Sequence, residues 1–128
     1  MPDALLVRVQ DTRLALPLSG EQTIAEVGPL APLPHGQPLL RGLTTLQGRA
    51  VPLLDLAPLL GHPDAPTPPL MVLTSLEGER VALLIDEVYG VTSVPTPPPG
   101  AGLLLDVPGG PLLNPAALIR DLREHLAS

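Results

Sequence analysis

Apolar and polar residues alternate along four stretches of the chain, and a short turn divides each stretch in two. Residues 5–18 place Leu5, Val7 and Val9 two apart, turn at residues 11–12 and return through a second alternating run. An apolar period of two predicts a β-hairpin. The same strand–turn–strand pattern recurs around residues 47–48, 77–78 and 109–110. These units predict an all-β domain built of barrels, because barrel closure removes exposed strand edges.

Local capping signals predict short helices between the hairpins. Residues 19–28 place Ser19 at an N-cap and Gln22 three residues later, which is the capping-box spacing, and Gly28 follows the last apolar residue. After the second hairpin, Asp55 is expected to cap a helical turn that ends at Gly61.

The C-terminal residues give the clearest helix signal. Asn114 is expected at the N-cap and Pro115 at the first helical position, and the residues after them share one apolar face: Leu118, Ile119, Leu122 and Leu126. The stretch LLNPAALI at residues 112–119 matches LLDLAPLL at residues 53–60 position for position. The sequence therefore predicts that a strand followed by a capped helical turn is used twice.

Length and composition restrict the class of protein. The chain has 128 residues, which predicts one domain covering residues 1–128. The chain has nineteen prolines, and three clusters of them, at residues 28–38, 62–69 and 95–102, are expected to be connections. Hydrophobic residues make up 45% of the chain, but there is one Tyr and no Phe or Trp, so the core must be aliphatic.

Charge, cysteine content and the length of the apolar runs disfavour several kinds of partner and site. Seven arginines and no lysine face thirteen acidic residues, for a net charge of −6, which disfavours nucleic acid. No cysteine is present, so no disulfide or thiolate metal site is expected. No apolar run approaches the roughly 20 residues that cross a bilayer. A cytoplasmic protein without direct membrane insertion is expected.

Candidate catalytic residues are few. The three histidines, His35, His62 and His125, are each solitary in sequence, and His62 with Asp64 makes only half of a metal site. The chain has neither a Walker lysine nor a G-x-S-x-G motif. We therefore expect no cofactor, no metal and no enzymatic activity.

Three carboxylates that end apolar strands leave one alternative open. The favoured role for Asp55, Asp86 and Asp106 is to cap turns. A hydrolytic site built from Asp55, Asp86 and His62 on a β-barrel is the less favoured alternative.

Four motifs occur in a fixed order: ALPL at residues 15–18, PLP at 32–34, GLTTLQGRAVPLLDL at 42–56 and ALLIDEVYGV at 82–91. The hairpin strands also contain more Leu and Val than one small barrel interior needs, which favours two barrels and an interaction surface. In this order and spacing the chain resembles the CheW-like domain, the adaptor of bacterial chemosensory arrays that also occurs as the regulatory domain of the kinase CheA.

The resemblance implies an all-β fold of two small five-stranded SH3-like barrels around a shared core, with short helical turns and a C-terminal helix. It implies a non-catalytic, cofactor-free adaptor that couples the cytoplasmic tip of a methyl-accepting chemoreceptor to the regulatory domain of a CheA-type histidine kinase. Recruitment from the cytoplasm to membrane-associated receptor arrays is expected, as is weak self-association.

The same resemblance assigns roles to individual residues. The candidate partner-binding residues are Arg41, Leu43, Thr45, Leu46, Gln47 and Thr23. The candidate structural residues are Gly42, Gly48, Asp55, Asp86 and Gly90.

The chain departs from the family pattern where that pattern is charged. Gln47 stands where the family signature has Arg, Thr23 where the helical turn has Glu, and Thr45 where the signature has Asn. Losing both members of a charge pair together avoids a lone buried charge, which costs on the order of several kcal/mol. The fold is expected to survive, whereas receptor binding can be altered or lost. The alternative function is therefore a divergent scaffold of a twitching, type IV pilus or other chemosensory system.

The end of the chain departs from the family pattern as well. The last hairpin is short, and Asn114 stands where the family has Asp. A trimmed second barrel, or a partner other than an ordinary chemoreceptor, would account for these differences.

Overall fold

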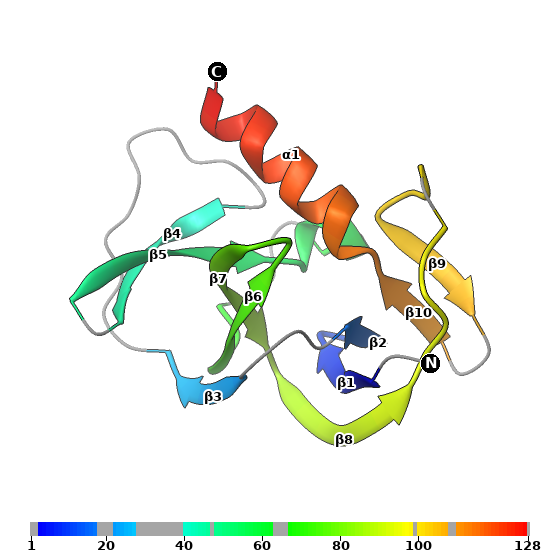
Figure 1. Cartoon of the computed structure of the whole chain (residues 1–128). Coiled ribbons are helices and arrows are strands. Elements are labelled where there is room, and N and C mark those ends of the chain that lie inside the picture. Colours follow the sequence, from blue (N-terminus) through cyan, green and yellow to red (C-terminus); the bar gives the residue numbers. More distant parts are fainter. Residues whose placement is uncertain are drawn as a thin grey trace.

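The computed structural model describes residues 3–17, 22–27, 40–46, 48–62, 67–98, 100–107 and 110–127. Within them the chain forms ten strands, one 3-10 helix and one α-helix (Figure 1). In chain order they are β1 (Asp3–Val9), β2 (Thr12–Pro17), β3 (Thr23–Glu26), β4 (Leu40–Leu46), β5 (Arg49–Asp55), η1 (Pro58–Leu60), β6 (Leu70–Leu76), β7 (Glu79–Ile85), β8 (Glu87–Ser93), β9 (Leu104–Val107), β10 (Gly110–Leu113) and α1 (Pro115–Ala127).

The strands form two five-stranded sheets. The first sheet has the order β8-β1-β2-β10-β9, and the second has the order β3-β6-β7-β5-β4. All four predicted hairpins are present as antiparallel pairs: β1–β2, β4–β5, β6–β7 and β9–β10. In each sheet one hairpin lies beside a strand of another hairpin in parallel, β2 beside β10 and β7 beside β5. The all-β prediction of two five-stranded units is confirmed.

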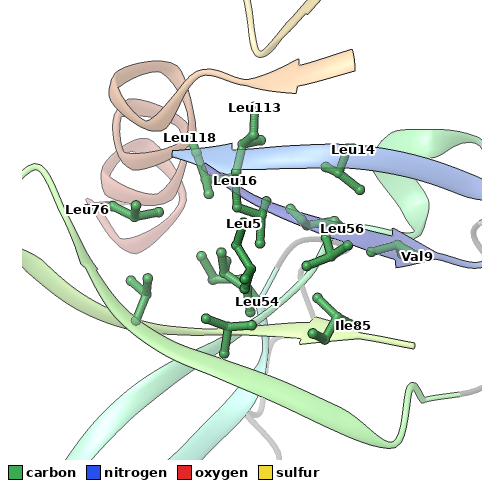
Figure 2. Close-up of a cluster of buried hydrophobic side chains, with 14 of the residues drawn as sticks. Leu5, Val9, Leu14, Leu16, Leu54, Leu56, Leu76, Ile85, Leu113 and Leu118 are labelled. Atoms are coloured by element: carbon green, nitrogen blue, oxygen red, sulfur yellow. The ribbon is translucent and has the colours of Figure 1, made fainter. Parts of the chain in front are cut away.

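The largest apolar cluster lies between the two sheets and against α1. Figure 2 shows its side chains converging from strands of both sheets and from the helix. Leu5, Val9 and Leu14 come from the first sheet, while Leu54 and Ile85 come from the second. This shared core is aliphatic, as the composition predicts, and it makes each sheet depend on the other for burial.

Each sheet also has a smaller cluster of its own. In the second sheet this cluster contains Val51, Leu53, Met71, Leu73, Ala82 and Leu84. In the first sheet it contains Ala4, Ala15, Val94 and Leu112. Alternate residues of one strand therefore face the shared core and the sheet's own cluster, as Leu54 and Leu53 of β5 do.

Two capped helical turns follow the parallel strands, as the internal sequence repeat predicts. The Asp55 carboxylate Oδ1 accepts a hydrogen bond from the Ala57 backbone N–H at 3.0 Å, before η1. The Asn114 side-chain Oδ1 accepts one from the Ala116 N–H at 3.2 Å, at the start of α1. Gly61 ends η1 with a left-handed φ of 93°. The Asn114 cap and the C-terminal helix are confirmed. Asp55 bonds the turn that leads into η1, whereas the N-cap residue of η1 itself, Ala57, has no side-chain cap bond.

The helix predicted over residues 19–28 is wrong where the structure describes that stretch. Residues Thr23–Glu26 form strand β3, which pairs antiparallel with β6. Thr23 and Ile24 are β-branched, and the backbone of β6 offers them a partner that local capping signals do not report. The proposed cap at Ser19 and the stop at Gly28 lie outside the described residues.

Strand β8 was not predicted as a separate element. A single residue, Asp86, separates it from β7, and it pairs with β1 of the first sheet, so Asp86 marks the point where the chain passes between sheets.

Candidate binding surface

Four of the candidate partner-binding residues, Arg41, Leu43, Thr45 and Leu46, lie on β4, at one edge of the second sheet. Burial alternates along this strand: Leu40 and Thr44 are buried, whereas Leu43 is half-buried and Thr45 is exposed. Leu43 lies opposite Pro52 of β5, and Thr45 lies opposite Ala50. The less buried residues, Arg41, Leu43 and Thr45, therefore form a strip along the sheet edge, called the β4 strip below. Such a strip is accessible to a partner.

Arg41 connects this strip to the buried end of β5. Its Nε lies 3.8 Å from Oδ2 of Asp55, and its Nη2 donates a hydrogen bond to Oγ1 of Thr67 at 2.9 Å. The Asp55 side chain is 2% exposed and the Arg41 side chain 35% exposed. Arg41 thus compensates a buried carboxylate while it keeps part of its guanidinium at the surface, where a further acceptor can reach it.

The region 67–69 joins the two edges of the second sheet. Thr67 accepts the bond from Arg41 at the start of β4, and the Val27 N–H, just after β3, donates to the Pro69 carbonyl at 3.0 Å. A hollow of about 450 Å³ lies between these segments, lined by Glu26, Val27, Thr67, Pro68, Pro69 and Leu70. From the sequence this stretch is predicted only as a proline-rich connection, because a threonine among prolines carries no signal for a distant arginine.

The structure does not bring all six candidate contacts together. Thr23 is exposed at the start of β3, and β3 and β4 are the two end strands of the second sheet. Gln47 lies outside the described residues, and so does the side chain of Leu46. The expectation that Thr23 and Gln47 replace a charge pair therefore stays a prediction.

Two of the candidate structural glycines have backbone angles that favour glycine. Gly48, in the β4–β5 turn, has φ 76°, and Gly90, in β8, has φ 145°. A side chain would strain the backbone at either position. Gly42 is buried in β4, opposite Leu53.

Asp86 and His62 lie in structural contacts. The Asp86 carboxylate Oδ2 accepts the Gln10 N–H at 2.8 Å, and the Asp86 N–H donates to the Arg8 carbonyl at 2.8 Å. This fixes the β1–β2 turn, where Gln10 has a positive φ of 54°. The His62 N–H donates to the Ala57 carbonyl at 2.9 Å.

The hydrolytic alternative gains no support from this arrangement. The carboxylates of Asp55 and Asp86 each accept a backbone N–H. No group of three or more His, Asp or Glu residues within the described ranges could hold a metal ion. Asp64, considered with His62, lies outside those ranges, and Asp106 is exposed within β9.

The site is thus an accessible strip on a two-sheet all-β fold, beside carboxylates that bond backbone N–H groups. The chain belongs to the CheW-like domain family, whose model matches residues 3–122. It is similar to Protein FrzA of Myxococcus xanthus, with 32% identity over 101 residues, and to Chemotaxis protein CheW of Thermotoga maritima, with 24% identity over 93 residues. The matches cover 74% and 72% of this chain, but only 63% and 62% of the two relatives.

A solved structure shows the same fold. The crystal structure of scaffolding protein TtCheW from Thermoanaerobacter tengcongensis matches with a TM-score of 0.65 and 14% identity, over 89% of this chain and 88% of that one. Together with the two five-stranded sheets, this match confirms the expected SH3-like fold. No described helix combines the length and apolar character that a membrane crossing requires.

Proposed function

We propose that this protein is a non-catalytic scaffold of a chemosensory pathway, with a single CheW-like domain over residues 1–128. It couples the cytoplasmic tip of a methyl-accepting chemoreceptor to the regulatory domain of a CheA-type histidine kinase. It acts in the cytoplasm, at membrane-associated receptor arrays. The observation that supports this proposal best is the accessible strip of β4, where Leu43, Thr45 and part of Arg41 face outward from a rigid, paired strand.

The strip suits protein binding rather than turnover. It offers a half-buried leucine, a hydroxyl and a guanidinium within one strand, which are groups that contact a partner surface without reacting with it. Its backbone is held by β5, so little conformational entropy is lost when a partner binds.

Isothermal titration of the full chain against the kinase regulatory domain and the receptor tip of the same organism tests the proposal. We expect saturable binding to both. Thr45→Glu should weaken binding to the receptor tip about tenfold or more, because it places a new charge on the strip. Thr96→Glu, at an exposed threonine outside the strip, is the matched control and should leave both affinities unchanged. The absence of binding to both proteins would overturn the proposal.

A second candidate function is a divergent scaffold of a twitching, type IV pilus or other chemosensory system, with altered or lost receptor binding. The uncharged residues Thr23, Thr45 and Gln47 favour it. The double variant Thr23→Glu with Gln47→Arg restores the family's charges. A gain of receptor affinity in the double variant, over a wild type that binds only the kinase, supports this reading; unchanged affinity contradicts it.

A further inference from the structure

The edge of the first sheet formed by β8 differs from an ordinary protein surface. Strand β8 pairs with β1 on one side and is the end strand of its sheet, so the hydrogen-bonding groups on its other side meet no described strand. It is seven residues long and contains neither proline nor lysine, which proteins commonly use to protect such edges.

Two apolar side chains are exposed on this edge strand. Tyr89, the single aromatic residue of the chain, is 40% exposed, and Val91 is 64% exposed, more than any other large hydrophobic residue in the described ranges. An unpaired edge with exposed apolar side chains is what an extended peptide recognises when it adds a strand to a sheet.

The pairing of β8 with β1 shifts register between Leu6 and Val7, which leaves Tyr89 as the extra residue of a bulge. Gly90 follows it with φ 145°. A bulge makes the edge irregular, so a flat strand of arbitrary sequence does not fit it. Recognition must then depend on the side chains beside the edge.

Two arginines lie beside Tyr89. Arg8 and Arg13 are opposite one another on β1 and β2, and the Arg13 guanidinium carbon lies 4.6 Å from the centre of the Tyr89 ring. Arg8 Nε donates to Glu87 Oε2 at 3.2 Å, and this bond raises the pKa of Arg8, with a further contribution from Tyr89. Arg8 also donates to the Gln10 carbonyl at 2.7 Å.

Among the residues that the structure describes, no carboxylate forms an ion pair with Arg13. Glu87 meets Arg8, and Asp86 accepts the Gln10 N–H, so neither neighbouring carboxylate is paired with Arg13 in the described part of the chain. Arg13 is itself exposed. The net charge of −6 repels an acidic partner as a whole, so the attraction for a carboxylate is local and comes from the Arg13 guanidinium beside Tyr89.

We propose that the β8 edge, with Tyr89, Val91 and Arg13, is a second docking surface that binds an extended acidic segment of a partner protein. The segment pairs with β8, places a carboxylate beside Arg13 and packs an apolar side chain against Val91. Because this surface belongs to the first sheet and the β4 strip to the second, one chain can hold two partners at once. The inference does not depend on the function proposed for β4.

The experiment is an NMR titration of the full ¹⁵N-labelled chain with a blocked peptide that alternates valine and glutamate. A peptide that alternates valine and lysine is the charge control. We expect the acidic peptide to shift the amide signals of β8 at about 1 mM or below, and the basic peptide to leave them unchanged. Equal shifts with both peptides, or none with either, overturn the proposal, as does a concentration-dependent dimer that occupies β8 instead.

Substitutions distinguish peptide binding at the β8 edge from a general effect of charge on binding. Val91→Asp should weaken peptide binding about fivefold or more, and Arg13→Gln should reduce it and lower its salt dependence. Ile24→Asp is the matched control, because Ile24 is 47% exposed on β3, the corresponding edge of the second sheet. Loss of binding in the Ile24 variant, or its retention in the Val91 variant, contradicts the assignment to β8.

Discussion

The two sheets share one strand arrangement, but their strands come from different parts of the chain and they bury different side chains. In each sheet an end strand pairs with a hairpin: β8 with β1–β2 in the first sheet, and β3 with β6–β7 in the second. The far strand of that hairpin lies parallel to β10 or β5, which pairs in turn with the opposite end strand, β9 or β4. All strands of the second sheet come from residues 23–85, whereas the first sheet joins the beginning of the chain to residues 87–113. The hairpin β6–β7, which is the last in sequence of the second sheet, therefore corresponds to β1–β2, the first hairpin of the chain.

The clusters private to each sheet are unequal. The second sheet buries three leucine or methionine side chains beside Leu53, namely Met71, Leu73 and Leu84. The first sheet surrounds Leu112 with two alanines and a valine. The second sheet can therefore hold its strands partly by its own apolar contacts, while the first depends more on the shared core (Figure 2) and on the chain ends that meet in it.

The largest expected effect on the free energy of unfolding tests this difference between the two clusters. Leu53→Ala should lower the free energy of unfolding by about 4 kcal/mol, and Leu112→Ala by about 2 kcal/mol. The large neighbours of Leu53 would leave a cavity, whereas the partly buried Leu105 and Val107 can move toward the space beside Leu112. Urea unfolding followed by far-UV circular dichroism measures both values. Val91→Ala, at an exposed site, is the control, and equal losses for the two leucines would show that the clusters are equivalent.

The two caps differ in chemistry at equivalent positions. Asp55 meets the Arg41 guanidinium at the start of β4. Asn114 instead donates through Nδ2 to the carbonyls of Ala101 and Gly102, before β9, at 3.0 and 3.1 Å. A carboxylate at position 114 would face two carbonyl oxygens. This accounts for an asparagine at position 114, because only an amide both accepts the cap bond and donates to those carbonyls.

Exchanging the caps is the second test. Asn114→Asp should lower the free energy of unfolding by about 2 kcal/mol at pH 7, because two donors are lost and an anion faces two carbonyls. Asp55→Asn keeps the acceptor for Ala57 and loses only the charge pair, so about 1 kcal/mol is expected. Thermal unfolding of both variants gives the comparison.

The pH dependence of the Asn114→Asp variant provides its control. The nearby carbonyls should raise the folded-state pKa of the new carboxyl, so the part of the penalty that comes from its ionisation is absent below the unfolded pKa of about 4 and grows as the pH rises from there to the folded value. Stability relative to wild type should therefore recover in acid. A penalty that is constant with pH would mean that the carboxyl does not face the carbonyls.

The elements that could be predicted are those whose signals are local. The four hairpins follow from alternation and turn residues, and the caps at Asp55 and Asn114 from residues two or three apart. Strand β3 could not be recognised in the same way, because four residues become a strand only through pairing with β6. Strand β8 follows β7 after the single residue Asp86, and its partner β1 lies near the beginning of the chain.

The two candidate surfaces differ in the same way in how far the sequence predicts them. The strip on β4 could be assigned from a signature within one hairpin, although its partners remain a proposal. The Arg41–Thr67 contact and the position of Arg13 over Tyr89 each depend on strands brought together by the fold. No spacing in the sequence encodes either contact, so the β8 surface could be found only in the structure.

The smallest expected effects concern two ion pairs that involve the second sheet, one to the buried Asp55 carboxylate and one between exposed side chains. Arg41→Gln should lower the free energy of unfolding by about 1 kcal/mol, because it leaves the buried Asp55 carboxylate without its cation, a loss moderated by the exposure of Arg41 and the 3.8 Å separation. Arg123→Gln removes a pair with Glu79 whose side chains are 62% and 48% exposed, and about 0.5 kcal/mol or less is expected. Urea unfolding at low and high salt measures both. Salt should erase the Arg123 effect and leave most of the Arg41 effect, because screening acts mainly on exposed pairs. If salt instead abolished both effects, the Asp55 cap would be as hydrated as a surface carboxylate, and the chemical difference between the two caps would not contribute to stability.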